Sequence, residues 1–316
     1  PPSSFTPKPL RNALIAFVAG IIIGVGIALL LEQFDTRVRS QDEVAAIFDM
    51  PLLAQIRRIR PKQLEEQPLV VLSDSHSPTA EGIRKLRGNL EFANVDGELK
   101  SLFITSALQH EGKTLTVCNL ALSLAAAGSR VVLVDGDLRR PQIHRYLYVA
   151  NAEGVSTVLT GKTSLSQALI QHPVGRTLVT VKATGSAVTG PDDAGLNVLT
   201  SGPIPPNAAE IIASKSFAGL IAELEKRFDL VIIDAPALLA VGDTAAIAAC
   251  VDGLLFLVDI NRARRPLLNE AAAQINQMPC RKLGLVVIGR SAGSKERDHY
   301  VYYAHGESPL DSEKQR

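Results

Sequence analysis

The chain has 316 residues, of which 46% are apolar, and a formal net charge of +1. This length suits one large α/β domain or two smaller units. A charge so close to neutral supplies no basic face for a nucleic-acid partner. The cysteines Cys118, Cys250 and Cys280 lie in apolar stretches without metal-ligand spacing. This pattern predicts buried thiols in a reducing compartment and gives no indication of a zinc site.

An uninterrupted apolar segment lies near the N-terminus. Residues 13–31, "ALIAFVAGIIIGVGIALLL", contain no charged side chain. As a helix this segment would be about 28 Å long, close to the ~30 Å hydrocarbon core of a bilayer. We therefore predict a transmembrane helix within a proline-rich N-terminal part, residues 1–34. Lysine and arginine are more frequent after the segment than before it, which favours a cytoplasmic C-terminal side.

The rest of the chain divides into a linker, a domain and a tail. Residues 35–75 begin with an amphipathic stretch and continue as the charged, proline-punctuated "RRIRPKQLEEQP", which indicates a juxtamembrane linker. Residues 76–290 alternate between apolar runs and helix-length segments, as expected of an α/β domain. Residues 291–316 are polar and hold three of the five tyrosines in "HYVYYAH". We expect this last part to be a flexible tail.

The apolar runs of the domain have the composition of buried strands. They are continuous stretches rich in Val, Ile and Leu, which is typical of parallel strands covered on both faces. Helical segments between them predict right-handed crossovers and a doubly wound, mostly parallel sheet of the P-loop NTPase kind. The expected strands are 101–105, 130–135, 196–202, 229–234, 253–259 and 283–289.

A phosphate-binding loop follows the first of these strands. "EGKT", residues 111–114, stands between a strand and a helix, although Ala107 replaces the first glycine of the common pattern. In such a loop, backbone N–H groups at the helix start bind phosphate oxygens, Lys113 reaches the terminal phosphates and the Thr114 hydroxyl ligates Mg²⁺. The residues expected to bind ATP are Gln109, His110, Glu111, Gly112, Lys113, Thr114 and Leu115.

Acidic residues end two further strands. Asp135 and Asp137 follow "VVLV", and Asp234 ends "LVIID". The carboxyl ends of parallel strands open into the crevice where ligands bind. Three acidic groups facing a phosphate loop would repel one another unless a divalent cation lies among them. The sequence therefore predicts a magnesium site, with Thr114, Asp135 and Asp234 as its ligands.

With these motifs the chain resembles the bacterial tyrosine kinases (BY-kinases) of capsule and exopolysaccharide synthesis. "EGKT" is similar to the family's Walker A motif, "VVLVDGDLRRP" to its Walker A′ motif and "LVIIDAP" to its Walker B motif. Glu81, Arg84 and Arg87 match its E-x2-R-x2-R oligomerisation motif. The proline-rich start and the apolar segment resemble the C-terminal transmembrane part of a polysaccharide co-polymerase (chain-length determinant).

The resemblance implies a membrane-anchored, ATP-dependent protein tyrosine autokinase that uses Mg²⁺. It implies catalysis by Lys113, Asp135 and Asp137, with either aspartate able to accept the phenolic proton. It further implies a homo-oligomeric ring that acts with the co-polymerase and the polysaccharide export machinery, and a tyrosine phosphatase that reverses the modification. The implied location of the protein is the bacterial inner membrane, with the kinase domain in the cytoplasm. The acceptors in neighbouring subunits would be Tyr300, Tyr302 and Tyr303.

Three departures from the family pattern leave other interpretations open. Gln109 and His110 replace the usual Pro-Gly pair, "DAPAL" replaces the more usual "DTPP", and Gly289 stands where an asparagine often contacts the base. One alternative is a non-kinase ATPase switch of the partitioning-ATPase class. Those proteins often have a second lysine early in the phosphate loop, which "SALQHEGKT" lacks, and they need no tail tyrosines. The other alternative is a regulatory subunit of the co-polymerase with a degenerate nucleotide site.

Overall fold

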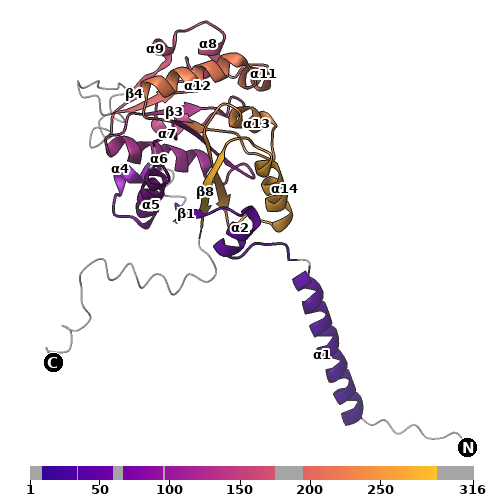
Figure 1. Ribbon diagram of the computed structural model, residues 1–316. Coiled ribbons are helices and arrows are strands. Elements are labelled where there is room, and N and C mark those ends of the chain that lie inside the picture. Colours follow the sequence, from indigo (N-terminus) through magenta and orange to yellow (C-terminus); the bar gives the residue numbers. More distant parts are fainter. Residues whose placement is uncertain (1–8, 34, 60–66, 95–96, 175–194, 290–316) are drawn as a thin grey trace, which may run out of the picture.

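The computed structural model describes residues 9–33, 35–59, 67–94, 97–174 and 195–289 (Figure 1). The strands are β1 (Leu52–Ile56), β2 (Ser101–Ser106), β3 (Val131–Asp135), β4 (Ile170–His172), β5 (Leu196–Leu199), β6 (Leu230–Asp234), β7 (Gly253–Asp259) and β8 (Arg281–Ile288). The longer helices are α1 (Pro9–Gln33), α2 (Gln41–Phe48), α5 (Pro78–Ala93), α6 (Lys113–Ala126), α12 (Lys215–Arg227) and α14 (Arg265–Asn276). The shorter helices are α4 (Val70–Ser73), α7 (Ile143–Leu147), α8 (Val155–Leu159), α9 (Leu165–Ala168), α11 (Ala208–Ile212) and α13 (Asp243–Ala248).

The described strands form one 8-stranded sheet in the order β1-β8-β7-β2-β6-β3-β5-β4. Neighbouring strands run parallel except β4 and β5, which are antiparallel. Every strand expected from the sequence is present, and the prediction of a mostly parallel α/β sheet is confirmed. The edge strands β1 and β4 were not predicted.

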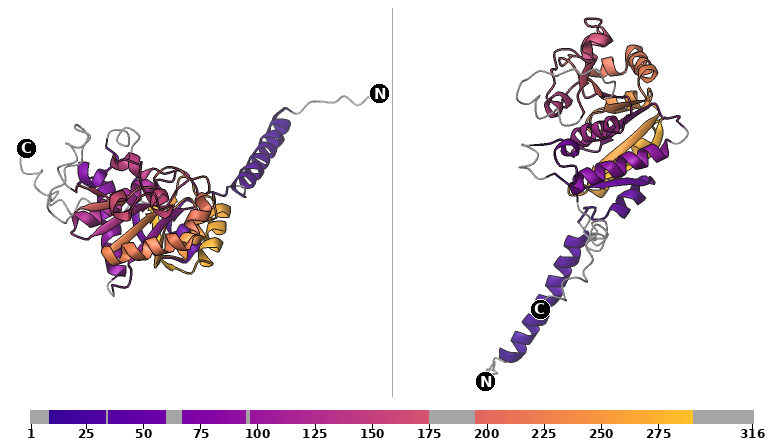
Figure 2. Two further views of the ribbon diagram at one scale, coloured as in Figure 1. Left: turned by 90° about the horizontal axis from the view of Figure 1, so that it is seen from above. Right: turned by 90° about the vertical axis from the view of Figure 1, so that its left-hand side faces the viewer.

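Helices cover both faces of the sheet, which is why the central strands are apolar throughout (Figures 1 and 2). Helices α5 and α6 contribute side chains such as Leu86 and Leu120 to the apolar cluster on one face. Helices α12, α13 and α14 contribute Phe217, Ile247 and Leu268 to the cluster on the other. This burial fixes the layers of the domain, and it leaves the carboxyl ends of the strands to bind ligands.

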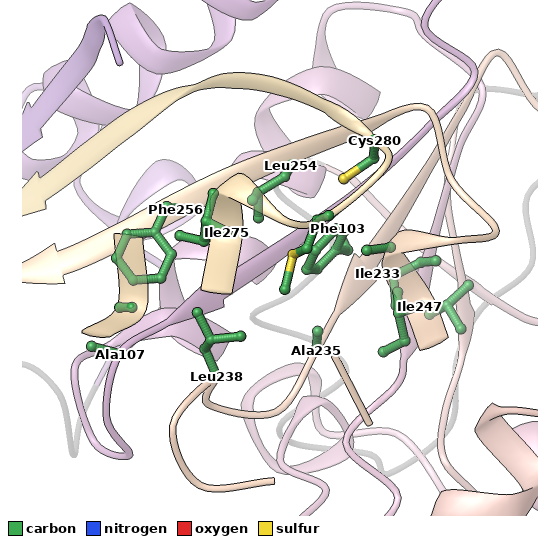
Figure 3. Packing of buried hydrophobic residues seen from close by; sticks show 14 of the residues in the cluster. Phe103, Ala107, Ile233, Ala235, Leu238, Ile247, Leu254, Phe256, Ile275 and Cys280 are labelled. Atoms are coloured by element: carbon green, nitrogen blue, oxygen red, sulfur yellow. The ribbon is translucent and has the colours of Figure 1, made fainter. Parts of the chain in front are cut away.

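Phe103 of β2 lies in the second of these clusters, among side chains of several strands and helices. Figure 3 draws it near Ile233, Leu254 and Ile275. Its side chain is fully buried. A buried aromatic ring of this size contributes several kcal/mol to folding.

Part of the segment interpreted as a linker packs onto the domain. The side chain of Ser40 accepts a hydrogen bond from the N–H of Glu43 and so caps α2. The ring of Phe48 in α2 lies 4.7 Å from the ring of Phe256 in β7, centroid to centroid. Strand β1 then pairs in parallel with β8. The α/β domain therefore includes α2 and β1.

Helix α1 contains the apolar segment of the N-terminal part. Large apolar side chains along it, such as Phe17 and Ile22, are exposed. Among the helices of the described ranges, none reaches the length and apolarity expected of a membrane span. The transmembrane helix thus stays a prediction.

Candidate active site

The order of the strands brings the phosphate loop and the strand-end aspartates together. Strand β2 lies between β7 and β6, and β3 lies beside β6. The loop that leaves β2 is therefore flanked by Asp259 at the end of β7 and by Asp234 at the end of β6. Asp135 at the end of β3 pairs directly with Asp234 in the sheet register. This edge is the crevice at which doubly wound sheets bind ligands.

Lys113 and Thr114 are the first two residues of α6, and both contact Asp234 at the end of β6. The Lys113 ammonium forms an ion pair with Asp234 Oδ1, and Thr114 Oγ1 donates to Asp234 Oδ2 at 2.7 Å. Gly112 precedes the helix with φ 86°, a left-handed conformation that glycine adopts without strain. The lysine and hydroxyl of "EGKT" thus meet the carboxylate of "LVIID" at the carboxyl end of the sheet.

Asp135 and Asp234 are buried carboxylates that lie side by side. Burial raises the pKa of Asp135 well above its ordinary range, and the charge of Asp234 raises it further. Burial also raises the pKa of Asp234, although the Lys113 ammonium opposes this shift. The Asp135 carboxylate accepts N–H bonds from Asp137 and Ile143. Because two adjacent carboxylates repel each other when both are ionised, a cation bound between them would favour their ionised forms.

The oxygen atoms of Thr114, Asp135 and Asp234 are suitable ligands for Mg²⁺. This ion prefers hard oxygen donors and keeps several of its waters, so it needs few protein ligands. Within the described ranges, no group of three or more His, Cys, Asp and Glu side chains could hold a metal ion. Two carboxylates and one hydroxyl beside a phosphate loop still fit magnesium that is held jointly with phosphate oxygens.

Asp137 occupies a different place from Asp135. It is half-buried and lines a cavity of about 210 Å³ together with Gln109, Arg140 and Pro236. Its Oδ1 atom accepts a 2.9 Å bond from the backbone N–H of Arg140. The cavity combines this carboxylate with apolar side chains of the segment after β6, including Ala240. It could admit a partly apolar group that carries an acidic proton.

A second cavity of about 300 Å³ lies on the other side of the loop. It is lined by Gly112 and Leu115 from the loop and α6, and by Arg57 and Arg58 from the segment after β1. Arg58 forms a 3.0 Å ion pair with the buried Asp259. These arginines belong to none of the motifs that predict the site. Their basic character was visible, but only the pairing of β1 with β8 brings them there.

The buried carboxyl of Glu111 gives stability a pH dependence. Burial raises its pKa to about 7. Its contribution to stability is complete below the pKa of the unfolded chain and is lost as the pH rises through about 7. Glutamine can still accept the 2.7 Å bond from the N–H of Leu108.

We therefore expect Glu111→Gln to abolish this loss. Relative to the wild type, the variant should gain up to about 3 kcal/mol of unfolding free energy between about pH 5 and pH 8. Urea titrations of both proteins across this range measure the difference. Parallel pH profiles would contradict the prediction.

The remaining predicted residues lie elsewhere. On α5, Arg84 pairs with Glu81 at 2.6 Å, while Arg87 lies 3.7 Å from Glu91. A Cβ at Gly289, where φ is 105°, would come within 2.6 Å of Asn261 Nδ2, so the backbone favours glycine there. The predicted acceptors lie outside the described residues; they are Tyr300, Tyr302 and Tyr303.

Comparison with known proteins finds no family model that matches the chain. The chain is 32% identical over 248 residues to the tyrosine-protein kinase YwqD of Bacillus subtilis (strain 168), covering 78% of this chain and 95% of the relative. It is 28% identical over 267 residues to the tyrosine-protein kinase etk of Escherichia coli (strain K12), covering 79% of this chain but 34% of that relative. The crystal structure of the chimerical protein CapA2B2 matches with a TM-score of 0.68 and 28% identity, over 79% of this chain and 99% of the other.

Proposed function

Since the chain belongs to the family of bacterial tyrosine-protein kinases, we propose that it transfers the γ-phosphoryl group of ATP to tyrosines of its own C-terminal segment. The observation that carries the proposal is the convergence of Lys113 and Thr114 on Asp234, with Asp135 beside it. Charge stabilisation at the β- and γ-phosphates is the main requirement of phosphoryl transfer.

The phosphate loop would hold ATP through its backbone N–H groups and the Lys113 ammonium. The nucleoside would lie in the cavity lined by Leu115 and Arg57. Thr114, Asp135 and Asp234 would hold Mg²⁺, which neutralises charge on the phosphates when bound. The loop and the lysine orient the γ-phosphoryl group toward its acceptor.

The acceptor tyrosine would enter the cavity that Asp137 lines. Its phenolic oxygen forms a bond to the γ-phosphorus, the bond from that phosphorus to the β,γ-bridging oxygen breaks, and ADP leaves with both bonding electrons. The phenolic proton goes to Asp137. We assign this role to Asp137 rather than to Asp135 because Asp137 borders the cavity, whereas Asp135 is fully buried.

We propose that transfer takes place between subunits of a homo-oligomeric ring, with α5 at the subunit boundary. In support, the Arg87 side chain is partly exposed on α5, and its Nη1 atom lies 3.7 Å from Glu91, which is longer than a direct hydrogen bond. A carboxylate of a neighbouring subunit would bind this guanidinium more closely. Phosphorylation would add negative charge to the tails and loosen the ring, and a tyrosine phosphatase would restore it. The ring would act with a co-polymerase in polysaccharide polymerisation and export.

Sedimentation of Arg87→Ala tests the subunit boundary. If this variant sediments as the same oligomer as the wild type, α5 is not the boundary.

We further propose that α1 anchors the chain in the bacterial inner membrane, with the kinase domain in the cytoplasm. The support is the exposed apolar surface of α1, which water does not favour. The full chain should then remain with membranes after an alkaline wash, and deletion of residues 9–33 should release it. Recovery of the full chain in the supernatant would reject the anchor.

Incubation of the purified chain with ATP and Mg²⁺ tests the proposed reaction. Phosphotyrosine should appear, and mass spectrometry should locate it in the C-terminal segment. A variant with phenylalanine at the acceptor positions keeps the described domain and should bind the nucleotide without becoming labelled. Equal labelling of that variant would place the acceptors elsewhere. The positions changed are Tyr300, Tyr302 and Tyr303.

A further inference from the structure

The phosphate loop contains a residue in an unfavourable backbone conformation. His110 has φ 63°, in the left-handed region that glycine adopts without cost but that side-chain-bearing residues enter at a cost. It precedes Glu111 and Gly112, whose N–H groups belong to the expected phosphate cradle. An unrestrained chain would tend to leave this conformation, so the loop requires contacts that hold it.

Arg262, from the turn between β7 and α14, makes such contacts. Its Nη1 atom donates to the carbonyl oxygens of Gln109 at 3.1 Å and of His110 at 2.9 Å. The turn that presents Arg262 is itself fixed. The N–H of Arg262 donates to the carbonyl oxygen of Asp259 at 2.9 Å. The carboxylate of Asp259 accepts from the N–H of Asn261 at 3.1 Å.

The direction of these bonds bears on phosphate binding. In a trans peptide, the C=O of one residue and the N–H of the next point in opposite directions. Carbonyls of Gln109 and His110 held toward Arg262 therefore turn the N–H groups of His110 and Glu111 away from it. A second arginine supports the same segment, since Arg140 Nη1 donates to Gln109 Oε1 at 2.6 Å.

We propose that Arg262 is a positioning residue for the reaction: it clamps the Gln109–His110 segment so that the phosphate loop is preformed for nucleotide. This inference rests on the proposed function, because it concerns the affinity of the same loop for ATP and ADP. Preformation lowers the ordering cost of binding. Arg262 thus affects nucleotide affinity without touching the reacting atoms.

A double-mutant cycle between Arg262 and His110 tests the clamp. Removal of a charged donor from two carbonyls should weaken binding of MgADP about tenfold in Arg262→Met. Glycine relieves the strain at position 110. In the His110→Gly background, Arg262→Met should therefore weaken binding of MgADP by at most about threefold. The exposed Arg264, two residues further along, provides the control, since Arg264→Met should bind as the wild type does.

The measurement is titration of each full chain with a fluorescent ADP analogue and Mg²⁺, with thermal unfolding recorded alongside. A tenfold loss in Arg262→Met that His110→Gly largely removes, with unfolding midpoints unchanged, supports the clamp. An equal loss in both backgrounds, or no loss at all, overturns it while leaving the kinase proposal intact. If the wild type binds no nucleotide, the proposed function and the clamp both fall.

Discussion

Replacing Lys113 with methionine is expected to lower the rate of autophosphorylation by a factor of at least about 100. Methionine has a similar length but no charge, so the loop loses the ammonium group that would stabilise the β- and γ-phosphates in the transition state. The measurement is the initial rate of phosphotyrosine formation at saturating ATP. Lys162→Met, which changes an exposed lysine outside the site, is the matched control and should keep the wild-type rate.

The Lys113 variant also needs a stability control, because the same ammonium pairs with the buried Asp234. Removing one partner of a buried ion pair is destabilising. Thermal unfolding should therefore confirm that the variant is folded at the assay temperature. A folded Lys113→Met protein that phosphorylates at more than about a third of the wild-type rate would remove this lysine from the mechanism, given that catalytic electrostatic contacts are worth much more than that.

Phe103→Ala should cost about 3–5 kcal/mol of unfolding free energy, the usual range for a large aromatic side chain in a close-packed core. The ring is fully buried in β2, and the alanine variant would leave a cavity beneath the strand that leads into the phosphate loop. Denaturant titration measures the loss. Ile204→Ala is the control, since this side chain lies outside α5, is 63% exposed and should change stability by less than about 0.5 kcal/mol. Equal effects of the two substitutions would contradict the assignment of Phe103 to the core.

The central strands were predictable because burial on both faces demands continuous apolar runs, which the sequence displays directly. The edge strands were not. Strand β4 has three residues, and β1 carries the polar Gln55 with a burial pattern that differs from the central strands. Short edge strands have no distinctive composition, since one side of each faces no partner. The amphipathic stretch that contains α2 was visible, but its docking depends on a contact between Phe48 and Phe256, which are far apart in the chain.

The candidate site likewise contains residues that were predictable from the sequence and residues that were not. Lys113, Thr114, Asp135 and Asp234 lie at positions where strand and motif agree, so their proximity followed from the fold class. The arginines at the site could not be predicted from the fold class and the motifs. Arg262 lies 152 residues from His110 in the chain, and an exposed arginine in a turn is ordinarily a solvated surface residue. Only the placement of β7 next to β2 brings its guanidinium to the loop.

The most direct test of the account mixes two full chains. One carries Lys113→Met and keeps every tyrosine of the C-terminal segment; the other keeps Lys113 and has phenylalanine in place of Tyr300, Tyr302 and Tyr303. Neither should phosphorylate its own C-terminal segment. After the chains are mixed with ATP and Mg²⁺, mass spectrometry should find phosphate on those tyrosines of the Lys113→Met chain. If the mixture converts ATP to ADP while these tyrosines stay unmodified, the claim of tyrosine phosphorylation between subunits is wrong.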